Sequence, residues 1–188
     1  MDKVKLGNNM LGNLESSRKL DEKAIVCSKW NWEHFRDGEL IDQWDETNIC
    51  TDEGLNALLD IMFHASTQIT AWYLLIFETD TTPAAGTTYA VPVFTECTAY
   101  TEGTRQEFVE SAASGKSLSN SANKAEFTMS GTKTIYGAAL VGGGTDANTK
   151  GDTAGGGTMY CASKFTASKD VENLDVLKVT CTLVASDV

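Results

Sequence analysis

The clearest pattern of hydrophobic and polar positions lies between residues 24 and 45. Trp30, Trp32, His34 and Arg36 recur at every second position, which is the period of one face of a β-strand. Asp37-Gly38 then supplies two residues that tolerate positive φ, as a two-residue hairpin turn requires. The sequence therefore predicts a β-hairpin with a return strand from Glu39 to about Asp45.

The register of this hairpin follows from the turn. Counting outward from Asp37-Gly38 places Phe35 opposite Leu40 and Trp32 opposite Gln43.

A short helix is predicted after the hairpin, at about residues 52–64. Thr51 is a good N-cap, and Asp52 and Glu53 place negative charge in the first turn, where the helix dipole favours it. One apolar stripe has the spacing of a buried helix face: Leu55, Leu58, Leu59 and Met62. We expect this stripe to pack against a sheet.

The remainder of the chain alternates between strand-like runs and turn-rich segments. The run 71–77 is short, apolar and aromatic, as in a strand buried on both faces. Further strands are predicted near residues 89–94, 107–112, 125–129, 134–141, 159–166 and 176–184. This pattern favours a mainly β fold, an antiparallel β-sandwich or jelly-roll-like domain with one short helix.

The domain organisation is predicted to be simple. Residues 1–23 are polar with few apolar anchors, so we interpret them as an extended N-terminal arm, either frayed or ordered on a neighbouring subunit. Residues 24–188 then form a single β-rich domain. Seven glycines between Val141 and Thr158 predict a long mobile loop, which is either a contact loop or a disordered tip.

Contacts with partners are predicted on the arm, the hairpin and the glycine-rich loop. The candidate partner-contact residues are Lys3, Lys5, Leu11, Leu14, Arg18, Trp30, Trp44, Gly143 and Gly156.

Charge and cysteine content narrow the function classes. The net charge of −11 repels phosphate backbones, so no nucleic-acid partner is expected. The first 25 residues show no apolar signal segment, and no apolar run is long enough to span a bilayer, so we expect synthesis in the cytoplasm and no membrane partner. Five cysteines in no paired motif favour free thiols, although pairing within or between subunits stays open.

No pattern of residues predicts catalysis, a cofactor or a metal site. His34 and His64 accompany no nucleophile motif and no ligand spacing, and Gly142-Gly143-Gly144 lacks the lysine and the helix of a phosphate-binding loop. Clustered carboxylates such as Asp42 and Asp45 are expected by chance among 26 acidic residues. Exposed tryptophans could instead stack on sugars, which keeps a carbohydrate-binding module as an alternative.

The segment from Trp30 to Phe77 resembles small structural proteins of tailed bacteriophages. The resemblance is carried by the hairpin, by the pattern N-x-x-T-x-E-G-L-N-x-L-L-D-x-x-F from Asn48 to Phe63, and by Trp72-Tyr73. It implies a non-enzymatic virion protein, whose expected role is to decorate or cement the capsid between capsomers. The implied partners are the major capsid protein and copies of the chain itself.

Two alternatives to capsid decoration stay open at this point. One is a tail, head–tail connector or fibre component, and the other is the carbohydrate-binding module. A host glycan is an expected partner only under these alternatives.

Overall fold

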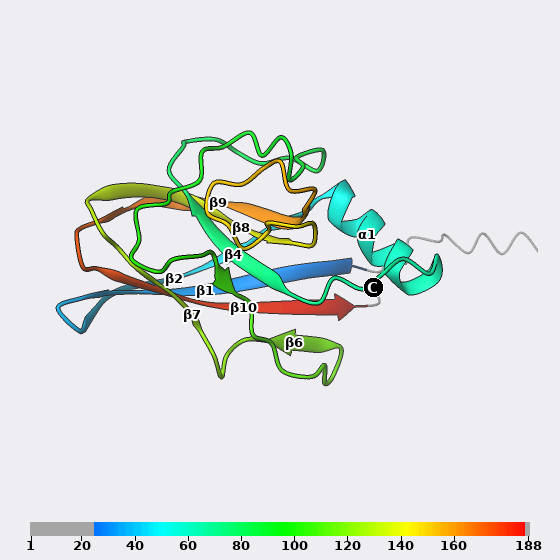
Figure 1. Cartoon of the computed structure of the whole chain (residues 1–188). Coiled ribbons are helices and arrows are strands. Elements are labelled where there is room, and N and C mark those ends of the chain that lie inside the picture. Colours follow the sequence, from blue (N-terminus) through cyan, green and yellow to red (C-terminus); the bar gives the residue numbers. More distant parts are fainter. Residues whose placement is uncertain (1–24, 187–188) are drawn as a thin grey trace, which may run out of the picture.

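Two antiparallel sheets make up most of the protein in a computed structural model, which describes residues 25–186 (Figure 1). Sheet A has the order β2-β1-β10-β6, with β7 also pairing with β10; sheet B has the order β3-β9-β8-β4-β5. The strands of sheet A are β1 (Ile25–Arg36), β2 (Glu39–Thr47), β6 (Ser117–Ser119), β7 (Ala125–Thr128) and β10 (Val176–Ser186). Those of sheet B are β3 (Ile49–Cys50), β4 (Trp72–Phe77), β5 (Gln106–Glu107), β8 (Lys133–Gly142) and β9 (Thr158–Val171). The predicted mainly β, antiparallel sandwich is confirmed.

The β1–β2 hairpin forms at the predicted turn but with a corrected register. Phe35 lies opposite Leu40 as predicted, whereas Trp32 lies opposite Trp44 and not Gln43. The cause is a register shift between His34 and Phe35. An irregularity of this kind is invisible to a count outward from the turn.

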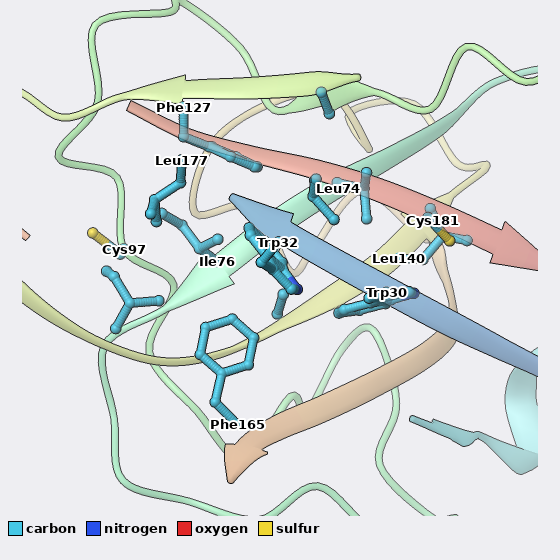
Figure 2. Close-up of a cluster of buried hydrophobic side chains, with 14 of the residues drawn as sticks. Trp30, Trp32, Leu74, Ile76, Cys97, Phe127, Leu140, Phe165, Leu177 and Cys181 are labelled. Carbon is cyan, nitrogen blue, oxygen red and sulfur yellow. The ribbon is translucent and has the colours of Figure 1, made fainter. Parts of the chain in front are cut away.

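The alternating faces of β1 and β10 build the core between the sheets. Trp30 and Trp32 are fully buried, as are Leu177, Val179 and Cys181 on the inward face of β10. The Trp32 ring stacks on Trp44 at 5.9 Å between centroids. Figure 2 shows the tryptophans of β1 gathered with Leu74, Ile76, Phe127 and Phe165 between the ribbons.

Two of the predicted strands differ from the structure. Residues 89–94 form bends and irregular backbone rather than a strand, and the predicted strand 107–112 is reduced to β5. Tyr89 and Phe94 instead belong to a second apolar cluster, with Leu75 and Phe77 of β4. Their apolar side chains therefore serve to cover a sheet and not to extend one.

Helix α1 (Asp52–Phe63) has the predicted position and cap, but its packing differs from the prediction. The Thr51 hydroxyl accepts a hydrogen bond from the Gly54 amide at 3.0 Å. The only buried residue of the helix is Gly54, whereas Leu58, Leu59 and Met62 are exposed. The expectation that the apolar stripe packs against a sheet is wrong, because the helix approaches β9 through its glycine.

An ion network ties the hairpin to the β9–β10 turn. Arg36 donates two hydrogen bonds to the Asp175 carboxylate, at 2.9 and 2.8 Å, and His34 Nε2 lies 2.8 Å from Asp175 Oδ2. The hydrogen bonds from Arg36 hold the pKa of Asp175 well below its usual range. His34 and Asp175 are thus a cross-strand structural pair.

The predicted N-terminal arm, residues 1–23, lies outside the described residues. Its boundary with the domain at residue 24 stays a prediction.

Replacing Gly54 tests the contact between α1 and β9. A Cβ at this position would lie 2.5 Å from the Tyr160 carbonyl oxygen. Helix propensity alone would stabilise Gly54→Ala by about 1 kcal/mol. The clash should reverse that sign and lower the free energy of unfolding by about 1–3 kcal/mol, measured by urea denaturation.

Gly86→Ala is the matched control, because nothing lies within 4 Å of a Cβ there. It should change the free energy of unfolding by no more than about 0.5 kcal/mol. Equal or greater stability of Gly54→Ala would contradict the described contact.

Replacing Asp175 tests the ion network. Asp175→Asn should lower the free energy of unfolding at pH 7 by about 2–4 kcal/mol, because it removes a buried acceptor of charged hydrogen bonds. Since the folded-state pKa is depressed, the ionised carboxylate stabilises the fold above the unfolded pKa of about 4 and does so less as pH falls below it.

The difference between wild type and Asp175→Asn should therefore shrink as the pH falls below that unfolded pKa of about 4. Asp80→Asn is the control, since Asp80 is exposed and forms its ion pair with Lys164 at the surface. A difference that grows as the pH falls below about 4 would contradict the account.

Candidate interaction surface

The first turn of α1 is anchored to sheet B by backbone and carboxylate contacts. The Thr51 amide donates to the Tyr160 carbonyl at 3.0 Å, and the Thr51 hydroxyl donates to the Met159 carbonyl. The Glu53 carboxylate accepts from the amides of Tyr89 at 2.9 Å and Met159 at 2.6 Å. The helix is therefore held rigidly at its first turn, so its later turns stand at a fixed place beside the sandwich.

The later turns of α1 present an uncovered apolar face. Leu59, Met62 and Phe63 are 54%, 66% and 81% exposed, values far above those of the core. In Figure 1 the helix lies at the end of the sandwich where β10 ends. Apolar side chains clustered in this way on a soluble domain are typical of a binding surface.

An apolar groove of about 410 Å³ lies between α1 and the end of the sandwich at which β10 ends, which we call the open end. Its lining residues come from both sheets, from the helix and from the segment after it: Gly54, Leu58, Ile61, Met62, Gln68, Ile69, Thr70, Trp72, Phe108, Glu110, Leu118, Leu140, Tyr160 and Leu183. The groove offers a partner mostly hydrocarbon, with little polar surface to fix a small substrate.

The predicted glycine-rich loop lies between β8 and β9, and its backbone folds back on itself. Gly144 has φ +65°, and a Cβ there would lie 2.2 Å from the Gly155 carbonyl oxygen. The Thr145 amide donates to that same carbonyl at 2.9 Å. Glycines are required here because two passes of backbone meet directly.

Arg105 is the residue that holds this loop. Its guanidinium donates to the carbonyls of Ala147 at 3.0 Å and Asp152 at 2.8 Å, and it pairs with Glu96 at 2.6 Å. The hydroxyl of Tyr89 donates to the Asp152 carboxylate at 2.7 Å, and burial raises the pKa of Tyr89 to about 12. All of these groups are satisfied by one another, so the cluster is structural.

No signal in the sequence identified Arg105. It lies in a polar segment, and its partners are up to 47 residues away along the chain.

The predicted partner-contact residues that the structure describes lie in different environments. Trp30 is 1% exposed and lies in the core, so its side chain is not available at this surface. Trp44 is half-buried, stacks on Trp32 and has Lys169 Nζ 4.2 Å from its ring centre. A Cβ added at Gly143 would lie 3.2 Å from Ile69 Cδ1, and Gly156 is exposed.

The five candidates on the arm, Lys3, Lys5, Leu11, Leu14 and Arg18, lie outside the described residues. Partner contacts at all nine positions stay predictions.

The described residues offer no cluster of His, Cys, Asp or Glu that could hold a metal ion. Within the same range, no helix is long and apolar enough to cross a membrane. Cys97, Cys161 and Cys181 are buried thiols, and burial raises the pKa of Cys181 to about 12. These three cysteines are therefore packing residues.

Comparison with known proteins places the chain in a phage family. The family model described as Podophage GP4 fiber I protein gp80 matches residues 50–185, which include every element from α1 to β9 and nearly all of β10. A search of curated proteins finds no match. The chain belongs to the family of Podophage GP4 fiber I protein gp80 and is a structural protein of the phage virion.

Proposed function

We propose that the chain is a non-enzymatic subunit of a phage fibre. The observation that carries this proposal is the family match, which covers most of the chain and describes a fibre protein. Decoration or cementing of the capsid, the role expected from the resemblance of residues 30–77, has no comparable support. The fibre alternative therefore becomes the main proposal.

The exposed face of α1 supports an assembly role. A fibre subunit must bury apolar surface against neighbouring subunits, and Leu59 and Phe63 offer such surface on a helix that is already fixed to the sandwich. Because the helix does not need to be ordered on binding, docking there costs little conformational entropy. These two residues do not line the groove, so they form a separate contact surface, which we call the outer helix face.

The core position of the tryptophans weakens the carbohydrate alternative. Sugar stacking needs an aromatic ring with a free face, and Trp30 has none because it is buried. The ring of Trp44 already contacts Trp32, Phe165 and Lys169. A glycan-binding role would have to use other residues.

Fractionation of virions tests the fibre proposal. Purified particles are separated into heads and tails with attached fibres, and the protein is quantified in each fraction by mass spectrometry. We expect it in the tail and fibre fraction. Recovery with heads, in numbers that match the capsid lattice, would instead support decoration and overturn the proposal.

A helix variant links the location to the proposed contact. Phe63→Asp should reduce incorporation into virions by about tenfold or more, since it places a charge in an apolar interface. Leu174→Asp is the matched control, because Leu174 is similarly exposed in the β9–β10 turn, away from α1. Both variants should keep wild-type circular dichroism.

A further inference from the structure

The apolar groove beside α1 is a second surface that the proposed fibre contact does not use. It is distinct from the outer helix face, since its floor is formed by Trp72, Leu140 and Tyr160 of sheet B. Leu118 and Leu183 of sheet A, which face each other across β6 and β10, form one side. A groove with walls from two sheets and a helix fits an extended or helical peptide segment better than a flat protein surface.

The chain outside the structure enters at this end of the sandwich. Ile25, the first residue of β1, pairs with Ser186, and Leu183 of the groove lies three residues before Ser186 on the same strand. Three residues of a strand span about 10 Å. The five residues from Leu20 to Ile25 can span about 16 Å, so Leu20 and all residues before it can reach the groove.

The segment 1–24 has the composition that the groove requires. Glycines at positions 7 and 12 interrupt any long helix that would bury its apolar side chains within the segment. The larger apolar residues are Met1, Val4, Leu6, Met10, Leu11, Leu14 and Leu20. A covalently attached segment also binds at a high effective concentration.

The charge of residues 1–24 also suits binding in the groove. Residues 1–24 carry five basic and four acidic side chains, a net charge of +1, whereas residues 25–188 carry ten basic and 22 acidic side chains, a net charge of −12. Glu110 lines the groove, and α1, which forms one of its walls, carries acidic side chains but no basic one. A second copy of the sandwich would bring further negative charge to this site, and the N-terminal segment would not.

We propose that the groove between α1 and the open end of the sandwich is the binding site for residues 1–24 of the same chain. Apolar side chains around Leu11 and Leu14 occupy the groove, and the basic residues of the segment lie near Glu110. The segment thereby covers the groove-facing side of α1 and leaves the outer helix face free. This inference does not depend on where the protein lies in the virion.

Site-specific photo-crosslinking of the full chain tests the assignment. Met62→p-benzoylphenylalanine places the reactive group in the groove, at a side chain that is 66% exposed. Val91→p-benzoylphenylalanine is the control, because Val91 is 65% exposed on the loop that covers the other face of sheet B. Irradiation of an equal mixture of ¹⁵N-labelled and unlabelled protein, followed by peptide mass spectrometry, identifies both the partner segment and the chain that contributes it.

The expected result is a crosslink from position 62 to a peptide within residues 1–24, with both peptides carrying the same isotope, and no such product from position 91. Crosslinks between differently labelled chains would overturn the proposal, whether they reach residues 1–24 or the sandwich of a second copy. Failure to capture residues 1–24 from position 62 would overturn it as well.

A paired variant separates specific docking from proximity. Leu11→Asp with Leu14→Asp should reduce the yield of the crosslink by about tenfold, because both apolar side chains are lost from the groove. Asn13→Asp with Ser16→Asp adds the same charge without removing apolar surface and should retain most of the yield. Equal yields from the two double variants would contradict docking through Leu11 and Leu14.

Discussion

Gly54 brings the first turn of α1 into direct contact with the backbone of β9. The positions of the uncovered helix face and of the groove beside it depend on this contact. No residue with a Cβ fits there, since its nearest neighbour would be the Tyr160 carbonyl oxygen at 2.5 Å. Gly54 is the only buried residue of the helix, and it contacts the backbone of β9. The apolar side chains of the later turns therefore have no sheet to pack against. The uncovered helix and the groove beside it both follow from this geometry.

The sandwich beneath the helix is completed by strands that the family match does not include. The match begins at residue 50, yet β1 is the central partner of β10 and contributes Trp30 and Trp32 to the core. Without β1, the inward face of β10 would lose its largest neighbours. On the opposite side of sheet B, Arg105 ties the glycine-rich loop to the loop that carries Glu96, so side-chain contacts hold these loops together where strands are few.

Local patterns predicted the elements, and non-local contacts decided where they pack. The Asp37-Gly38 turn, the Thr51 cap and the alternation of β10 are short-range signals, and the structure confirms all three. The register of Trp32 was missed because a strand irregularity leaves no mark in the alternation of side chains. The exposure of Leu59 and Met62 was missed because apolar spacing shows which residues share a helix face, and not whether another element covers it.

Local sequence patterns were likewise not enough to decide the function. Residue types excluded neither a fibre nor a capsid role, and the resemblance of residues 30–77 led us to expect a virion protein that decorates or cements the capsid. The longer match over residues 50–185 favours the fibre.

A cryo-electron microscopy reconstruction of the intact virion tests the central claim most directly. The account predicts density for the two-sheet sandwich within a fibre, with the outer helix face at Leu59 and Phe63 buried against a neighbouring subunit. Density for this fold on the capsid shell between capsomers, or in a fibre with α1 facing solvent, would contradict it.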